Sequence, residues 1–326
     1  MSKDILVFVE QRDGVLENVG FELLGEARRL ADKVEGSKVV GAVIGDNSST
    51  LAKELVNSGA DAIYFVEDKC LKHYLNETYA KALEAILKEV EPNVVLIGAS
   101  SIGRDLAPRL SARINTGLTA DCTKLDIDAD GKLFSTRPAF GGNLFATIVC
   151  PDHRPQMSTV RPGVMKRAEK GQESVEIKEI KVEFTTPRVE VLEYVKEKVT
   201  CCRIEDAKHL VAVGRGVGNE ESINNARELA ALLDGTVATS RALVDEGMMP
   251  SSCQVGQTGK TVRPDLYLAF GISGAVQHLA GMEDSDYIIA VNKDKTASIF
   301  NVADLGIVGD GNAILPLLIE EIKKLK

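Results

Sequence analysis

The chain has 326 residues, of which 44% are hydrophobic and 27% charged, and its formal net charge at pH 7 is −9. A chain of this length and composition can bury two cores of ordinary domain size. The acidic balance, the absence of tryptophan and an aromatic content of only 5% argue against nucleic acid as a partner, because nucleic acids bind basic surfaces and stacking side chains. No apolar run is long enough to cross a bilayer, so no membrane insertion is expected.

The N-terminus and the cysteines indicate a reducing compartment. The apolar run from Ile5 ends at Glu10, which is too short for a secretory signal and is typical of a buried strand. The six cysteines include no Cys-x-x-Cys pair, so we expect free thiols and no metal site. We therefore expect a bacterial cytoplasmic protein, with the mitochondrial matrix as the less favoured alternative.

The first half of the chain alternates short β-branched runs with segments of helical periodicity. Strands are predicted at 4–9, 38–44, 62–66 and 93–98. Helices are predicted at about 21–34, 78–90 and 103–114. This order predicts a parallel sheet with helices on both faces.

From Leu118 onward the pattern changes to that of antiparallel β-structure. A strand over 119–127, a turn at Asp130 and Gly131 and a strand over 133–137 form a hairpin pattern. Two further β-segments follow, at 143–150 and 156–160. We therefore expect the first domain to end in antiparallel additions.

The periodic pattern weakens between about 186 and 206, where Pro187 and a charged stretch precede Cys201 and Cys202. We expect a first domain over 1–190, of nucleotide-hydrolase-like type, a linker over 191–205 and a second domain over 206–326. Strands of the second domain are predicted at 209–213, 236–239, 266–270 and 287–291, with two short ones around Ile299 and Ile307. Its helices are predicted at 220–233, 274–281 and 313–326. The fold class is α/β, with two doubly wound, mostly parallel-sheet domains, the second of them Rossmann-like.

A glycine-rich turn follows the first strand of the second domain. Gly214, Gly216 and Gly218 come directly after 209–213, where a nucleotide's phosphates can approach backbone N–H groups. The usual dinucleotide fingerprint would place glycine at Asn219 instead. Tight packing of the turn is therefore an equally good interpretation.

Ser240 and Arg241 stand at the end of the next predicted strand, where NAD-binding domains carry an acidic residue. Three roles are open for Arg241. It can hold the 2′-phosphate of NADP, which makes an NADP-dependent oxidoreductase subunit the alternative function. It can lie against a flavin ring and stabilise the reduced, anionic form. It can also form an ordinary surface salt bridge.

The segment 254–261 ends like an ATP-binding P-loop, in Gly259, Lys260 and Thr261. Gln254 stands where that motif needs its first glycine, and Pro264 breaks the helix that must follow. A P-loop is therefore excluded. The composition favours a loop that presents amides, Gln257 and Thr258 to a planar heteroaromatic ring.

Small residues also follow the strand at 266–270. A turn of this kind lets a pyrophosphate lie at the start of the helix predicted over 274–281. His278 falls about one turn into that helix, on the side of Gly274, and a structural histidine is the other interpretation. Asn292 and Asp310 stand at the carboxyl ends of later strands, where open α/β sheets bind ligands.

Taken together, these motifs resemble the FAD domain of electron transfer flavoprotein alpha subunits. The segments 103–108, 117–121 and 154–163 resemble the first domain of the same family, so the resemblance covers nearly the whole chain. It implies an FAD-carrying subunit that shuttles electrons between dehydrogenases, such as an acyl-CoA dehydrogenase, and a redox acceptor. The subunit is either a simple carrier or part of an electron-bifurcating system, and it is not a stand-alone substrate-converting enzyme. A beta subunit that binds AMP or a second FAD completes the heterodimer and contacts the first domain.

The resemblance also implies which residues contact FAD. Arg241 is expected beside the isoalloxazine ring and His278 near its O2 edge, where both tune its redox properties. Gln257 and Thr258 are expected to line the ring, and Asn292 to help hold the pyrophosphate and adenosine half. The matching positions are Arg215, Ser240, Arg241, Val255, Gly256, Gln257, Thr258, Ser273, Gly274, Ala275, Val276, Gln277, His278, Asn292 and Asp310. A non-catalytic nucleotide sensor is a further alternative, because folds of the first domain's type also occur in nucleotide-binding proteins.

Overall fold

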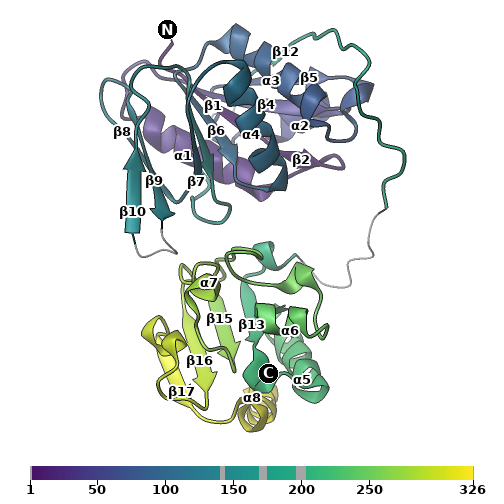
Figure 1. Cartoon of the computed structure of the whole chain (residues 1–326), viewed down its shortest axis with the longest axis vertical. Helices are drawn as coiled ribbons and strands as arrows, with labels where there is room; N and C mark the ends of the chain where they lie inside the picture. Colours follow the sequence, from purple (N-terminus) through teal and green to yellow (C-terminus); the bar gives the residue numbers. More distant parts are fainter. Residues whose placement is uncertain (1, 140–143, 169–174, 196–202, 326) are drawn as a thin grey trace. The chain divides into compact units, whose positions relative to one another are not determined.

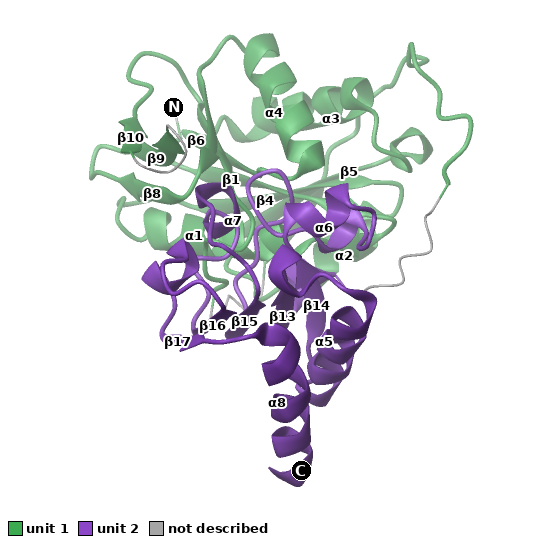
Figure 2. Cartoon of the chain, turned by 60° about the horizontal axis from the view of Figure 1, so that its bottom comes forward, with its two compact units in different colours: residues 1–195 green, residues 196–326 purple. Residues whose placement is uncertain are grey.

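The computed structural model describes residues 2–139, 144–168, 175–195 and 203–325 (Figure 1). The chain divides into two compact units, residues 1–195 and 196–326, which Figure 2 distinguishes by colour. None of the helices in these ranges combines the length and apolar character needed to span a membrane. Cys70, Cys122, Cys150 and Cys253 are free thiols, whereas Cys201 and Cys202 lie outside the described residues.

The first unit is built on a seven-stranded sheet in the order β12-β5-β4-β1-β6-β11-β7. All of its strand pairs are parallel. The strands are β1 (Ile5–Val9), β4 (Val39–Gly45), β5 (Ala62–Glu67), β6 (Val94–Gly98), β7 (Leu118–Cys122), β11 (Gln156–Val160) and β12 (Glu176–Glu179). β1, β4 and β6 are nearly continuous Val, Ile and Leu runs and are buried along their whole length, as expected for strands covered on both faces.

Four helices cover the two faces of this sheet. Helices α1 (Asn18–Ala31) and α2 (Ser48–Glu54) contribute to one apolar core, and α3 (Asn76–Val90) and α4 (Ser101–Arg113) to the other. In α1, for example, Leu23, Ala27 and Leu30 recur at helical spacing and are fully buried. The remaining short elements are β2 (Gln11–Arg12), β3 (Val15–Leu16) and the 3₁₀ helix η1 (Lys69–Leu71).

Antiparallel structure in the first unit is less extensive than the sequence predicts. It comprises the small β2–β3 hairpin and a three-stranded sheet in the order β10-β9-β8. That sheet is formed by β8 (Lys124–Ile127), β9 (Leu133–Ala139) and β10 (Leu144–Ile148). The predicted antiparallel ending is therefore only partly right, because β7 and β11 pair in parallel within the main sheet. The single strand predicted over 119–127 is wrong. Asp121 has a positive φ of 62°, and the chain leaves the main sheet there to start the smaller one.

The second unit is a five-stranded parallel sheet in the order β14-β13-β15-β16-β17. Its strands are β13 (His209–Val213), β14 (Thr236–Thr239), β15 (Leu266–Phe270), β16 (Ile288–Asn292) and β17 (Leu305–Val308). The order reverses between β13 and β15, which is the topological switch point at which doubly wound sheets bind ligands. The predicted fold class is confirmed for both units.

The two faces of the second sheet are covered differently. Helices α5 (Glu220–Leu232) and α8 (Gly311–Leu325) pack on one face, together with the short α6 (Arg241–Asp245). The other face is covered by irregular segments and short helices. The short helices of the unit are η3 (Ile204–Asp206), η4 (Arg215–Val217), η5 (Ser251–Cys253), α7 (Val276–Leu279) and η6 (Ser298–Asn301).

Two predictions for the second unit are wrong. The helix predicted over 274–281 contains only the four residues of α7, because Gly274 has a φ of 81° and Ala275 is extended. The short strand predicted around Ile299 is the 3₁₀ helix η6. Ile299 is fully buried there, and its N–H donates to the carbonyl of Ser273 at 3.0 Å. This tertiary contact replaces sheet pairing.

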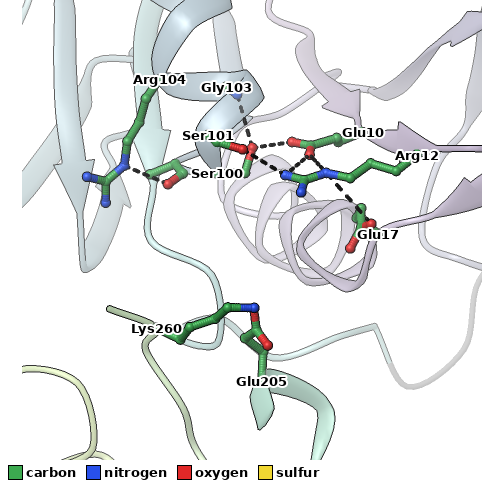
Figure 3. A network of polar contacts seen from close by, with 10 residues as sticks. Glu10, Arg12, Glu17, Ser100, Ser101, Gly103, Arg104, Glu205 and Lys260 are labelled. Carbon is green, nitrogen blue, oxygen red and sulfur yellow. Dashed lines mark hydrogen bonds and ion pairs between the residues drawn. The ribbon is translucent and has the colours of Figure 1, made fainter. Parts of the chain in front are cut away.

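A buried carboxylate lies at the carboxyl end of β1, between that strand and the start of α4 (Figure 3). Glu10 is 1% exposed, accepts a hydrogen bond from the Ser100 hydroxyl and is paired with Arg12 at 2.8 Å. Ser100 in turn caps α4 by accepting from the N–H of Gly103 at 3.0 Å. Arg12 also donates to the Ser101 hydroxyl at 3.1 Å, so the side chains at the start of α4 are bonded to one another.

We predict that Glu10→Ala lowers the free energy of unfolding by about 1–3 kcal/mol, because the half-buried Ser100 hydroxyl loses its acceptor and Arg12 loses its shortest ion pair. The Arg12 side chain is 42% exposed and can be hydrated again, which favours the lower part of that range. Urea denaturation followed by circular dichroism measures the change. Glu54→Ala, at an exposed position in α2, is the matched control and should change stability by less than about 0.5 kcal/mol. Equal effects of the two variants would contradict the role given to Glu10.

Candidate functional site

The structure brings the predicted site residues of the second unit to the carboxyl edge of its sheet. They lie in the turns after β13, β14 and β15, in the loop 254–261, at the end of β16 and after β17. Backbone hydrogen bonds join these segments into one surface. For example, the N–H of Ser240 donates to Val213, that of Val255 to Thr239 and that of Gly309 to Asn292.

Two glycine turns are packed against each other at the switch point. The N–H of Gly214 donates to Phe270 at 2.8 Å, and that of Gly216 donates to Gly271 at 3.1 Å. A Cβ atom on Gly214 would lie 2.5 Å from the carbonyl oxygen of Gly271, a distance that no side chain tolerates. Backbone packing therefore accounts for Gly214 and Gly216, and their N–H groups are already donated within the protein. Between them, Arg215 is exposed and has no ion-pair partner among the described residues.

The loop 254–261 lies on the segment that contains α7. The N–H of Gln257 donates to the carbonyl of Gln277 at 2.7 Å. Gly256 has a φ of 138°, and a Cβ atom there would lie 2.7 Å from the same carbonyl oxygen. This close contact places Gln257 and Thr258, both exposed, beside residues 277 and 278. Lys260 is paired with Glu205 of η3 (Figure 3), and no helix follows Thr261, as expected once a P-loop is excluded.

The turn after β15 is fixed by the backbone of η6. Gly274 is buried with a φ of 81°, and a Cβ atom on it would lie 2.1 Å from the nitrogen of Ile299. Around this fixed point Ser273, Ala275 and Gln277 are exposed, as is the apolar Val276. The turn therefore presents two polar side chains, Ser273 and Gln277, and two apolar ones, Ala275 and Val276, at the sheet edge.

His278 is buried and has one ring nitrogen without a partner. Its Nε2 lies 3.0 Å from the hydroxyl of Tyr267, and its Nδ1 has no hydrogen-bond partner among the described residues. Burial lowers the pKa of His278 to about 4, so its ring is neutral at physiological pH. A contact with the backbone of Val255 has the smaller, opposite effect on this pKa. A buried nitrogen of this kind fits a site that completes its hydrogen bonding with a ligand.

Arg241 is the first residue of α6, and its side chain is 67% exposed. Its guanidinium lies 3.3 Å from Asp245, one turn further along the helix. Among the described residues, no hydrogen bond or ion pair joins its side chain to another predicted site residue. An exposed pair at this helical spacing is worth only about 0.3–0.5 kcal/mol, so the guanidinium can leave Asp245 at little cost.

Asn292 and Asp310 have structural partners of their own. The side-chain amide of Asn292 donates to Ile272 at 2.8 Å, and its carbonyl accepts from the N–H of Asp294 at 2.9 Å. Asp310 is paired with Lys293 at 3.0 Å, and this hydrogen-bonded pair lowers the pKa of the carboxyl group. Contact of either residue with a ligand stays a prediction.

Sequence reasoning missed Tyr267 and Glu205. Tyr267 stands in an otherwise apolar strand, and a buried tyrosine hydroxyl needs a hydrogen-bond partner. A tyrosine at this position was therefore the one sign in the sequence of a buried polar contact. Glu205 lies at the end of the predicted linker, and nothing in the local sequence indicates its pairing with Lys260.

Comparison with known proteins identifies the family. A family model of the electron transfer flavoprotein domain matches residues 5–185, and a model of the electron transfer flavoprotein FAD-binding domain matches residues 203–283. The chain is 55% identical to electron transfer flavoprotein subunit alpha of Thermoanaerobacterium thermosaccharolyticum, over 99% of both chains. The chain belongs to the electron transfer flavoprotein alpha-subunit family.

Other relatives of this family carry related names. The chain is 50% identical to protein FixB of Clostridium saccharobutylicum, over 99% of this chain and 97% of the relative. It is 47% identical to the acryloyl-CoA reductase electron transfer subunit beta of Anaerotignum propionicum, over 99% and 96%. The resemblance noted in the sequence is confirmed, and so is FAD as the cofactor of the second domain. The matches give no support to the NADP interpretation of Arg241.

The residues at the sheet edge fit an electron transfer flavoprotein FAD site. The Nδ1 atom of His278 is buried and has no hydrogen-bond partner among the described residues, and the turns that Gly256 and Gly274 fix by close backbone packing carry the exposed polar residues Gln257 and Ser273. Arg215 and Arg241 are exposed cations at the same edge of an acidic chain. These features suit a planar ring that carries a pyrophosphate.

We predict that His278 makes the second unit less stable as the pH falls from about 6.5 to about 4. The unfolded ring binds a proton below its ordinary pKa of about 6.5, whereas burial keeps the folded ring neutral down to about 4. The unfolded state therefore binds more protons in this window. As the pH falls from about 6.5 to about 4, this residue lowers the free energy of unfolding by up to about 3 kcal/mol. Urea denaturation at several pH values measures the slope. In His278→Gln the slope should be smaller, and identical slopes would refute the assignment.

Proposed function

We propose that this chain is the alpha subunit of a heterodimeric electron transfer flavoprotein, which holds FAD at the carboxyl edge of its second sheet and passes electrons from a dehydrogenase to a redox acceptor. The observation that carries the proposal is the single surface formed there by the turns after β13, β14 and β15 and the loop 254–261, within the part of the chain that matches the family's FAD-binding domain. FAD, when bound, takes up and releases electrons, and its reduction adds negative charge at the N1 and O2 end of the ring.

The residues of this edge have two tasks in the proposal. Arg241 supplies a fixed positive charge beside the ring, and His278 supplies a hydrogen-bond donor at the O2 edge, so both favour the reduced, anionic cofactor. Gln257 and Thr258 line the ring. Ser273, Gly274, Ala275 and Asn292 hold the pyrophosphate and adenosine half, and Arg215, Ser240, Val255, Gly256, Val276, Gln277 and Asp310 complete the site.

We further propose that a beta subunit, carrying AMP or a second FAD, covers part of the first unit. The support is an exposed apolar edge strand, β10, in which Leu144 is 58% exposed and Phe145 is 68% exposed. Edge strands with exposed apolar side chains promote aggregation unless another surface covers them. The dehydrogenase partner belongs to a class such as the acyl-CoA dehydrogenases. We also propose a cytoplasmic location, for which the bacterial sources of the relatives are the support.

Purification of the chain together with its beta subunit tests this function. We expect a yellow complex, and the ratio of FAD to heterodimer then separates the two modes of action. One FAD per heterodimer indicates a simple carrier, and two indicate an electron-bifurcating system. A colourless complex that does not take up added FAD would contradict the proposed function.

We predict that Arg241→Ala lowers the midpoint potential of the bound flavin, because removal of a nearby cation weakens the stabilisation of reduced FAD. At an exposed position the charge is worth about 1 kcal/mol, which corresponds to roughly 20 mV for a two-electron couple. Spectroscopic redox titration of the complex measures the shift. Arg263→Ala removes the same charge at the opposite, amino edge of the sheet, where Arg263 lies 3.8 Å from Asp286, and should leave the potential unchanged. Equal potentials in the two variants would rule out the role of Arg241.

A further inference from the structure

Tyr267 is a fully buried tyrosine and the second residue of β15. Its neighbours in the strand are apolar, so burial of its hydroxyl is costly unless the group is hydrogen-bonded. The partner is His278, whose Nε2 lies 3.0 Å from the hydroxyl oxygen. The two rings are arranged edge to face, with centroids 6.3 Å apart. No second hydrogen bond of this hydroxyl occurs among the residues that the structure describes.

This single contact determines where the protons lie. If Nε2 of His278 carried the proton and donated it to Tyr267, the hydroxyl hydrogen of Tyr267 would be buried without an acceptor. If Tyr267 donates instead, its hydrogen is satisfied and Nε2 is the acceptor. Burial raises the pKa of Tyr267, so its hydroxyl stays protonated and available as a donor. The neutral imidazole then carries its own proton on Nδ1, for which no hydrogen-bond partner occurs among the described residues, and the backbone of Val255 lies beside the ring.

We propose that Tyr267 is a positioning residue that holds His278 in the Nδ1–H tautomer, so that the buried Nδ1–H is presented to an acceptor atom of the cofactor. The choice of acceptor rests on the proposed function and is the carbonyl oxygen at the O2 edge of the flavin. The opposite tautomer would present a lone pair to that oxygen and repel it. Tyr267 therefore determines whether His278 attracts or repels this edge of the ring.

The tautomer is measured directly in the full complex of the chain with its beta subunit. The histidines are labelled with ¹⁵N, and the ring signals of His278 are assigned by their loss in His278→Gln. We expect the wild-type complex to show a protonated Nδ1 and an unprotonated Nε2, both before and after removal of FAD. A protonated Nε2 in the wild type would overturn the proposal without recourse to any variant of Tyr267.

Tyr267→Phe removes only the hydroxyl and tests the consequence for binding. We expect the His278 signals to shift toward the Nε2–H form and FAD to dissociate about five-fold more readily, equivalent to about 1 kcal/mol. Tyr287→Phe is the control, because Tyr287 is 46% exposed and lies before the start of β16, at the amino edge of the same sheet. It should leave both readouts unchanged.

A double-mutant comparison separates positioning from a general structural effect. If Tyr267 acts through His278, Tyr267→Phe combined with His278→Gln should bind FAD no more weakly than His278→Gln alone. Additive losses, or an unchanged tautomer in Tyr267→Phe, would overturn the proposal. A complex that never binds FAD contradicts the proposed function instead, and the tautomer measurement on the FAD-free complex still decides the role of Tyr267.

Discussion

Close backbone packing between two turns determines the shape of the carboxyl edge in the second unit. Gly214 and Gly216 after β13 contact Gly271 after β15 so tightly that a single methyl group at Gly214 or Gly271 would force the turns apart. Because β13 and β15 are neighbours at the switch point, this contact fixes the spacing between the two halves of the edge. The positions of Arg215 on one side and Ser273 on the other follow from it.

The loops that present these residues are also part of the core of the unit. Among the described residues, no long helix lies over one face of the sheet, which is covered instead by buried side chains from the loops and short helices, among them Val255, Ile272 and Ile299. Burial of each such side chain contributes about 1.5–3 kcal/mol. The exposed polar groups at the edge therefore lie on loops that also contain buried apolar residues. These buried residues hold the loops against the sheet and limit the motion of the polar groups.

The sequence predicts the elements of the second unit well where the pattern is local. The strands at 209–213, 236–239 and 266–270 have the predicted bounds, because each is a short β-branched or apolar run bounded by polar residues or glycine. Their carboxyl ends could be assigned to one edge because the sheet is parallel. Prediction failed where distant residues decide the structure, as at Gly274, whose turn is set by Ile299. The pairing of Tyr267 with His278 was missed for the same reason, since it depends on how α7 folds back on β15.

The loops at the carboxyl edge both present the proposed cofactor-binding residues and cover one face of the sheet. Cofactor supply is therefore linked to the lifetime of the protein. A ligand that binds only the folded state stabilises it in proportion to the logarithm of ligand concentration over Kd. Here the ligand would rest on segments such as 254–261, whose Val255 side chain helps to cover one face of the sheet. When FAD is scarce, the folded state loses this stabilisation, so a larger fraction of the molecules unfolds and becomes cleavable by cellular proteases. The abundance of the subunit would then follow flavin availability without any dedicated regulator.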